Sequence, residues 1–422
     1  MNEKLLQFIW QFQYFNKEHL IATDGTALQI ISAGQLNTNQ GPDFSEARIK
    51  IGKTLWAGNI EMHVLSSQWN DHGHTQDKNY DNIILHVVWA HDTEITATTP
   101  LVTLELQQYV SKIMLQHYEQ LMQAKGFVPC ENYLPAITDV AWLSWKERLA
   151  AERLQRKSSE VIIILQQVNN HWEEVLWRML AKNFGMKVNA EIFEQLASSI
   201  PVNILAKHKN QLHQLEALLM GQALLLQGDF KEDYPQLLQR EYKFLAKKYK
   251  LKPLNKAPDF LRMRPANFPT IRLAQLAALV NQSTHLFSRI LEIKDIEALQ
   301  KLLNVTANDY WHYHYCFDEE TTYKPKNIGS AMTDNLIINT VIPLLFAYGI
   351  FHNAQQWKER AINFLTQLSP ESNNITKQWK GKDVANKNAL DSQALIELKN
   401  NYCTQKRCLN CAVGNNILKR SE

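Results

Sequence analysis

Apolar residues recur in two different rhythms along this chain, and the rhythm changes near residue 107. Residues 4–16 place apolar side chains at helical spacing, which predicts a short amphipathic helix. Residues 143–168 begin a series of longer helical patterns. The runs between the first helix and residue 107 are typical of strands, separated by a polar segment at 66–81. Strands are predicted at 19–23, 26–34, 47–52, 56–64, 82–90 and 99–106, and further helices at 171–184, 212–226 and 234–250.

This order predicts an α+β protein, with an N-terminal mixed sheet and flanking helix followed by a mainly α-helical region and a cysteine-bearing tail. We place the first domain at 1–110, the helical domain at 111–368, and a connector with the C-terminal tail at 369–422. Residues 369–393 are polar and poor in large apolar side chains, so we expect a solvated connector or an exposed helix. The tail after it is expected to pack back.

The longest apolar run, 335–351, is interrupted by Asn339 and Pro343, which favours a core helix over a membrane span. The N-terminus lacks the pattern of a signal peptide. We therefore expect a cytoplasmic protein without a membrane partner. A net charge of +3 in 422 residues is too small to indicate a polyanionic partner by itself. The sequence does not indicate an oligomeric state.

Acidic and imidazole side chains gather around the third and fourth predicted strands. Asp43 follows Pro42 at the start of a strand, and Glu61 and His63 lie two apart in the next one. Side chains two apart in a strand share a face. If the two strands form a hairpin, Asp43 comes level with that pair. Two carboxylates that converge in this way can hold Mg²⁺ or Mn²⁺ and assist hydrolysis, whereas turn chemistry at Pro42-Asp43 and a polar outer strand face are the plainer alternatives.

The arrangement Pro42-Asp43, then Glu61-Met62-His63, resembles the PD-(D/E)xK nuclease superfamily. There a helix precedes the sheet, the Asp of a Pro-Asp pair opens one strand, and an acid-x-Lys pair lies on the next. The resemblance implies a nuclease-like sheet whose catalytic residues are Asp43, Glu61 and His63, with Asp43 and Glu61 as metal ligands. His63 replaces the lysine, and helix 4–16 has no acidic residue at its centre, since Glu3 and Glu18 flank it.

A second group of polar residues follows at His72, His74 and Asp77, with His86 inside an otherwise apolar strand. His86 alone is typical of a hydrogen-bonded core histidine. Together with His63, these histidines are also candidates for a zinc site.

Several short segments spread along nearly the whole chain share one resemblance. They are 39–44, Glu61-x-His63, Trp69-x-x-His72-x-His74, 85–88, 262–269, Asn339-x-x-x-Pro343 and the closing cysteine group. With these segments the chain resembles an uncharacterised bacterial family called domain of unknown function 2851. The resemblance supplies no activity, so the chemistry rests on the residues.

Lys and Arg are concentrated between residues 240 and 272, with aromatic residues interleaved. Such a stretch can bind phosphates and stack bases, or it can be a solvated helix face whose aromatic residues lie in the core. The second interpretation is favoured slightly for 240–256. We predict phosphate contacts from Arg262, Arg264 and Arg272, which lie among prolines at a helix start.

Three of the five cysteines close the chain at Cys403, Cys408 and Cys411. A CxxC pair with a third thiol upstream is typical of a metal site that needs a fourth ligand, for which we choose Cys130 over Cys316. The spacing fits Zn²⁺ or an iron–sulfur cluster. Buried thiols without a metal are the alternative.

These features favour a metal-dependent nuclease-like protein that acts on DNA or RNA. The alternatives are a non-catalytic nucleic-acid-binding or scaffold protein of the same fold, and a zinc hydrolase acting on a small phosphoester or amide.

Overall fold

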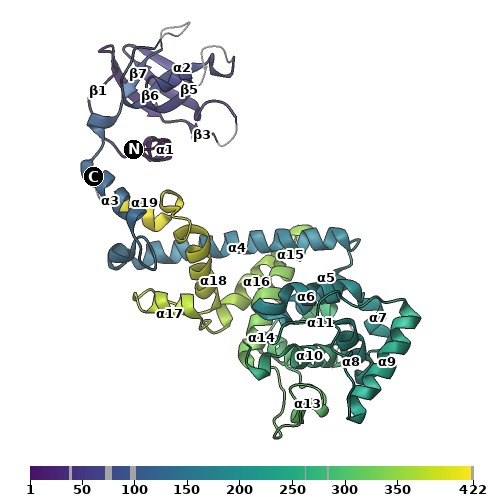
Figure 1. Cartoon of the computed structure of the whole chain (residues 1–422). Coiled ribbons are helices and arrows are strands. Elements are labelled where there is room, and N and C mark those ends of the chain that lie inside the picture. The colour runs from purple at the N-terminus through teal and green to yellow at the C-terminus, as the bar shows by residue number, and fades with distance from the viewer. Residues whose placement is uncertain (38–39, 72–77, 96–100, 262, 283–284, 420–422) are drawn as a thin grey trace. The chain divides into compact units, whose positions relative to one another are not determined.

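The chain divides into two compact units in the computed structural model, which describes residues 1–37, 40–71, 78–95, 101–261, 263–282 and 285–419 (Figure 1). Unit 1 comprises Met1–Trp145, Gly381–Val384 and Glu397–Glu422, and unit 2 comprises Lys146–Lys380 and Ala385–Ile396. The protein is mixed α+β and 57% helical, with the sheet in the N-terminal part. Unit 1 therefore extends beyond the 1–110 expected for the first domain, and it includes the closing segment of the chain.

A seven-stranded mixed sheet that curves nearly into a barrel forms the centre of unit 1. The strand order is β1-β2-β4-β5-β6-β7, and β3 pairs with β4. The pairs from β1 to β5 are antiparallel, whereas β5 pairs with β6, and β6 with β7, in parallel. The strands are β1 Leu20–Ile21, β2 Ala27–Ser32, β3 Gln35–Leu36, β4 Phe44–Ile51, β5 Thr54–Leu65, β6 Ile83–Ala90 and β7 Thr103–Glu105.

In the second half of strand β5, buried apolar side chains alternate with buried polar ones. Ile60 and Met62 point to one face, and Glu61 and His63 to the other, because side chains alternate along a strand. All four side chains are buried, so both faces of the sheet are covered here. A carboxylate and an imidazole inside the protein need polar partners, and these partners define the candidate site.

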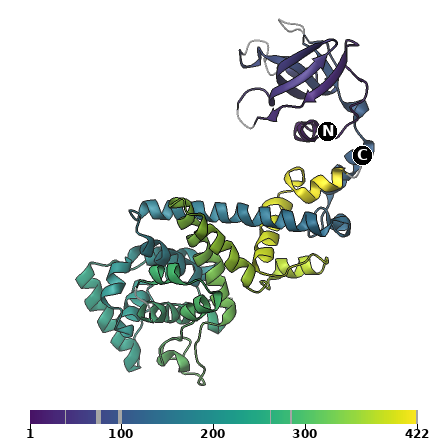
Figure 2. The same cartoon turned by 180° about the vertical axis from the view of Figure 1, so that it is seen from behind.

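Helix α1 (Glu3–Phe12) packs against β5 and β3 (Figures 1 and 2). The side chain of Asn2 caps its start by accepting from the Leu5 amide at 2.9 Å, and Gln13 ends it in a left-handed conformation. Helix α2 (Gln68–Asp71) also packs against β5. The other helical elements that lie wholly in unit 1 are η2 Lys78–Tyr80, η3 Gln107–Tyr109, α3 Lys112–Gln123, η4 Glu131–Ala136, η7 Leu398–Cys403, η8 Cys408–Asn410 and α19 Ala412–Lys419.

Unit 2 is mainly helical in its described residues, with longer non-helical stretches at 251–261 and 314–329 and two isolated bridges. The long helix α4 (Asp139–Gln167) begins in unit 1 and continues into unit 2. The further helices of this part are α5 Trp172–Phe184, α6 Met186–Ser199, α7 Val202–Lys207, α8 Leu212–Gln222, α9 Asp233–Tyr249, η5 Pro265–Asn267, α10 Pro269–Gln282, α11 Leu286–Glu292, α12 Ile296–Leu303, α13 Tyr310–Tyr313, α14 Ser330–Leu336, η6 Ile337–Val341, α15 Ile342–Phe351, α16 Gln355–Gln367, α17 Asn374–Lys380 and α18 Ala389–Glu397.

The polar segment after residue 369 differs from the exposed connector expected from its composition. Residues 389–395 of α18 are all buried. Asp391 is buried because its carboxylate lies 2.9 Å from the Lys146 ammonium, so the two charges are paired. The Trp379 indole donates to the carbonyl of Leu395 at 3.1 Å. Pairing and hydrogen bonding thus place a polar sequence inside unit 2.

The apolar run around Asn339 forms a π-helix, η6, between α14 and α15. Pro343 has no amide hydrogen, so the Asn339 carbonyl lacks its usual helical donor, and the Asn183 side chain donates to it instead at 3.3 Å. Ser330–Phe351 is the one described stretch long and apolar enough to cross a membrane, and 67% of its apolar window is buried inside the protein.

Candidate functional site

The loop before β4 brings Asp43 level with Glu61. Phe44 pairs with Ile60 in the antiparallel ladder, so the residues beside them, Asp43 and Glu61, are neighbours across β4 and β5. The Asn37 side chain donates to the Pro42 carbonyl at 3.0 Å, and this hydrogen bond links the two ends of the loop. The hairpin therefore brings together the two carboxylates that the sequence pattern singled out.

Each of these two residues hydrogen-bonds to the other's strand. The amide of Asp43 donates to Oε2 of Glu61 at 3.1 Å, and the amide of Met62 donates to Oδ2 of Asp43 at 3.1 Å. From α1, the Gln7 side chain donates to Oδ1 of Asp43 at 2.8 Å. The carboxylates are thus held in fixed positions by the backbone and by the first helix.

Both carboxyl groups resist ionisation. Burial raises the pKa of Asp43 to about 7, and the charge of Glu3 adds to the rise. Burial raises the pKa of Glu61 to about 8, with smaller contributions from the charges of Asp43 and then Glu3. The charge of Glu3, at the start of α1, thus acts on both carboxyl groups, a contribution that sequence reasoning set aside. The signal was its spacing of four residues from Gln7, which puts both on one helix face.

Two buried histidines continue the site on the same part of the sheet. His86 on β6 lies opposite Glu61 in the parallel ladder. Nδ1 of His63 lies 2.8 Å from Nε2 of His86, so one of the two nitrogens donates and the other accepts. Nε2 of His63 lies 3.9 Å from Oε1 of Glu61. The Trp69 ring packs against His86 with centroids 5.1 Å apart.

The structure therefore brings Asp43, Glu61, His63 and His86 together. Of the two histidines, His63 is the one whose ring nitrogen lies near the Glu61 carboxylate. The other members of the second predicted group, His72, His74 and Asp77, lie outside the described residues.

A β-bulge lies next to this site. The pair Phe44–Ile60 is separated from the next pair, Ala47–Gly58, by a shift of register in β4. Within the bulge Glu46 has φ 59°, a strained conformation for a residue with a side chain. Bulges of this kind re-aim the adjacent strand and recur beside active sites.

Two of the three arginines predicted to contact phosphate, Arg264 and Arg272, do not share one surface. Arg264 is exposed, whereas Arg272 is buried in α10 and Arg262 lies outside the described residues. The Arg272 guanidinium donates to the side-chain oxygens of Gln275 at 2.9 Å and of Asn267 at 2.6 Å. Arg272 thus already has acceptors inside the protein.

Four of the five cysteines line one small cavity in unit 1. Cys130 comes from the residue before η4, while Cys403, Cys408 and Cys411 come from the closing segment. All four are buried, and the cavity has a volume of about 10 Å³. Burial raises the pKa of Cys130 and of Cys408 to about 12, and neighbouring thiols add to both rises. Cys316 is in unit 2.

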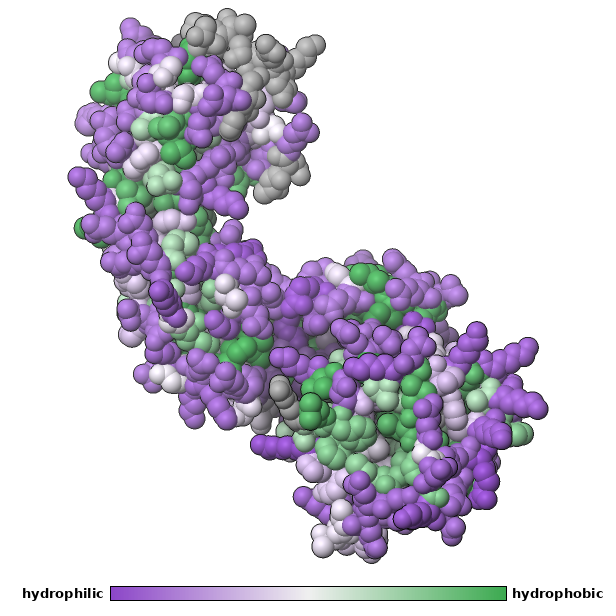
Figure 3. Space-filling model, viewed as in Figure 1, coloured by the Kyte–Doolittle hydropathy of each residue, from purple (hydrophilic) through white to green (hydrophobic). Residues whose placement is uncertain are grey.

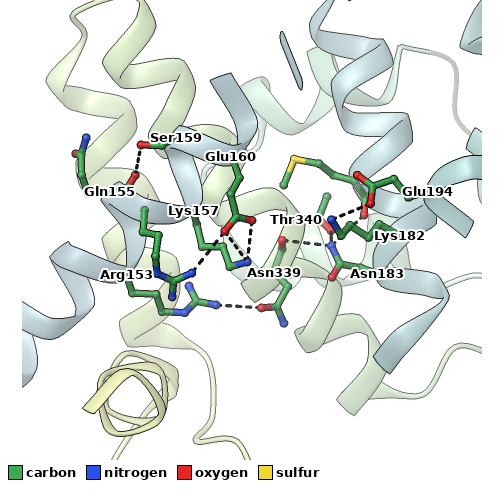
Figure 4. A network of polar contacts seen from close by, with 12 residues as sticks. Arg153, Gln155, Lys157, Ser159, Glu160, Lys182, Asn183, Glu194, Asn339 and Thr340 are labelled. Atoms are coloured by element: carbon green, nitrogen blue, oxygen red, sulfur yellow. Dashed lines mark hydrogen bonds and ion pairs between the residues drawn. The ribbon is translucent and has the colours of Figure 1, made fainter. Parts of the chain in front are cut away.

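A larger hollow of about 380 Å³ lies in unit 2 beside η6. Its lysines are already paired, Lys157 with Glu160 and Lys182 with Glu194, both at 2.9 Å (Figure 4). Asn339 lies between these pairs and accepts from Arg153 at 3.0 Å. The charges of the hollow are balanced, which gives no preference for an anionic or a cationic ligand.

In the described part of the chain, no group of three or more His, Cys, Asp or Glu side chains stands as a ready-made metal site. Asp43 and Glu61 are two such ligands, and Mg²⁺ is often held by one or two carboxylates and otherwise by water and substrate. The donor set of the carboxylate site thus fits that ion.

Residues 3–374 match the family model described as protein of unknown function DUF2851. The match includes the carboxylate site and Cys130 but ends before the closing cysteines. No curated protein and no solved structure matched the chain.

Proposed function

We propose that this chain, which belongs to the DUF2851 family of proteins of unknown function, is a metal-dependent nuclease-like protein that cleaves phosphodiester bonds of DNA or RNA. The observation that carries the proposal is the interlocked pair of carboxylates, Asp43 and Glu61, on adjacent strands beside a buried imidazole pair.

The raised pKa values of Asp43 and Glu61 support a cation at this position. Two carboxyl groups held side by side in a buried place repel each other when both are ionised, so each keeps its proton or accepts a counter-charge. A divalent cation would supply that counter-charge, polarise the scissile phosphate and lower the pKa of a water. The charge of Glu3 increases the preference for a cation.

In this proposal the chain's own groups divide the remaining work. Asp43 and Glu61 would hold the cation, which when bound would orient the reacting phosphate. His63 lies on the same face as Glu61 and takes the place that lysine has in the resembling nucleases, with His86 fixing its ring by the 2.8 Å hydrogen bond. An imidazole so oriented can pass a proton to the leaving oxygen, but it carries less positive charge than a lysine at neutral pH. We therefore expect slow cleavage.

Cleavage assays on labelled single- and double-stranded DNA and RNA test the proposal. We expect Mn²⁺- or Mg²⁺-dependent cleavage that falls by about 100-fold or more in Asp43→Asn and Glu61→Gln. His63→Lys should retain or raise the activity. Glu18→Gln, which changes an exposed carboxylate before β1, is the matched control and should cleave like the wild type. Equal cleavage by wild type and Asp43→Asn, or none with any metal, would refute the proposal.

A second candidate function, nucleic-acid binding without cleavage, is favoured by one face of α9. Lys243, Lys247 and Lys248 are exposed there, and Phe244 is exposed by 61%. The edge of unit 2 where α9 lies is covered by hydrophilic side chains (Figure 3). Exposed cations beside an exposed aromatic ring suit phosphates and an unpaired base.

This second function predicts a salt-dependent affinity for single strands. Each lysine that contacts a phosphate should contribute about 0.7 to the slope of log affinity against log salt, so Lys243→Gln/Lys247→Gln should flatten that slope. Phe244→Ala should weaken binding without changing the slope. Fluorescence anisotropy at several salt concentrations measures both, with the exposed Lys294→Gln as control. An unchanged slope in the double variant would exclude this face.

A further inference from the structure

The cysteine cavity of unit 1 lies apart from the carboxylate residues in sequence and is built from different side chains. Its thiols come from two places in the chain, the residue before η4 and the closing segment. Each is buried, and the four share the cavity wall with Pro129, Tyr402, Arg407 and Gly414. Four of the five cysteines line this one cavity, and the fifth lies in unit 2. This grouping indicates that the four thiols act together.

The local backbone around Cys411 has the features of a metal-binding knuckle. The amide of Cys411 donates to the carbonyl of Cys408 at 3.2 Å and closes the CxxC turn. Burial raises the pKa of the Cys411 thiol, while the backbone amides of Gly414 and Val413 act on its sulfur as donors in the opposite direction. Donors directed at a sulfur stabilise its thiolate form, which is the form that binds metal.

Gly414 is needed for this turn. A Cβ placed on Gly414 would overlap the carbonyl oxygen of Cys408 and would lie 2.9 Å from its carbonyl carbon. The close approach of the α19 backbone to Cys408 therefore depends on the missing side chain.

Three basic side chains act on the thiols or line their cavity. The charge of Lys399 acts on Cys403 and that of Lys406 on Cys408, while Arg407 lines the cavity. The Arg407 guanidinium lies 4.7 Å from the centre of the Tyr402 ring, which holds it in place. A divalent ion with four thiolates carries two net negative charges, and these cations would offset them.

We propose that Cys130, Cys403, Cys408 and Cys411 bind one soft divalent ion, zinc, as a structural centre that fastens the closing segment within unit 1. Thiolates select zinc over magnesium, and four ligands close the shell. In the described structure the four thiols do not form a completed coordination shell. Rotation of each cysteine about its Cα–Cβ bond would bring the sulfurs to the ~2.3 Å that a sulfur–zinc bond requires. A cavity of about 10 Å³ has space for one ion rather than for a multi-iron cluster.

Metal analysis of the purified full-length protein tests this centre without any nucleic acid. We expect one zinc ion per chain in the wild type and in Cys316→Ser, which removes the cysteine of unit 2. Cys130→Ser, Cys408→Ser and Cys411→Ser should each lose the ion. Zinc retained by Cys130→Ser, or iron with acid-labile sulfide in the wild type, would overturn the proposal.

Because a cysteine variant can fail to fold, the wild type is also titrated with Co²⁺ after removal of its metal. We expect the intense visible absorption of tetrahedral cobalt with thiolate ligands, at one ion per chain, and its loss when zinc is added. Gly414→Ala keeps all four thiols but should weaken cobalt binding by about 10–100-fold. Octahedral cobalt spectra, or no binding, would overturn the proposal, and neither outcome depends on whether the carboxylate site cleaves phosphodiesters.

Discussion

Glu61→Gln should raise the thermal stability of the protein at pH 8.5 and leave it almost unchanged at pH 5. The pKa of Glu61 is raised to about 8 in the folded protein from an ordinary value of 4.5. Between these values the folded state holds a proton that the unfolded state has released. Stability is therefore fully present below about pH 4.5 and is lost as the pH rises through 8. A glutamine has no proton to lose, so the variant avoids this loss.

The size of the effect follows from the shift. One pKa unit corresponds to about 1.4 kcal/mol, and sharing of the effect with Asp43 reduces the gain to about 1–3 kcal/mol at pH 8.5. For a protein unit of this size each kcal/mol raises the melting temperature by about 2–4 °C. The amide oxygen of glutamine can still accept from the Asp43 backbone, so the geometry is kept.

Calorimetric or fluorescence melting between pH 5 and 9 measures this, with Glu18→Gln as control. Adding Mn²⁺ at pH 8 should stabilise the wild type but not Glu61→Gln, because the cation replaces the proton at the carboxylates. If both proteins lose stability equally as the pH rises, the buried carboxyl is not responsible. If Glu61→Gln gains stability and loses cleavage, Glu61 serves the function of the protein at a cost in stability.

Gly221→Ala should destabilise unit 2 by about 1–3 kcal/mol, through overpacking between α8 and α9. A Cβ on Gly221 would overlap the ring of Tyr242. That ring cannot simply turn away, because its hydroxyl donates to the buried Gln222 side chain at 3.0 Å. The substitution would stabilise an unhindered helix, since alanine favours helix over glycine by about 1 kcal/mol. A loss of stability therefore reports the contact.

Urea unfolding measures the change, and a double-mutant cycle identifies its cause. Gly221→Ala combined with Tyr242→Leu should lose less than the sum of the two single variants, because the leucine leaves room for the new methyl group. Gly329→Ala is the control, since a Cβ there meets nothing within 4 Å. Strict additivity of the two substitutions would contradict the proposed overlap.

Local patterns could predict much of the sheet and its hairpin. The antiparallel pairing of β4 with β5 follows from two strand-like runs on either side of Gly52, which has φ 59°. That pairing was sufficient to place Asp43 beside Glu61. The parallel pairing of β5 with β6 could not be predicted, because the polar crossover between them contains no signal for register. His86 therefore comes beside His63 only in the folded structure.

Burial of polar residues was the other limit. Asp391 is part of a segment whose composition indicates an exposed connector, and its burial depends on Lys146, which is distant in the sequence. The importance of Glu3 likewise depends on how α1 lies against the sheet, which helical spacing alone does not define. Partners of this kind are set by tertiary packing, and no local pattern contains them.

The chain leaves unit 1 at Trp145, returns to it briefly at Gly381–Val384, and rejoins it at Glu397 after residues Ala385–Ile396 of unit 2. A ribosome making this chain releases all seven strands before the residues of unit 2, and Cys403, Cys408 and Cys411 only after them. Cys130 is therefore synthesised before unit 2, whereas the other three cysteines of the cavity are synthesised after it. A chain that stops before Cys403 contains all seven strands and the helices of unit 2, but it lacks three of the four cysteines that line the cavity. Closure of that cavity therefore requires two segments of unit 1 that lie on opposite sides of unit 2 in the sequence.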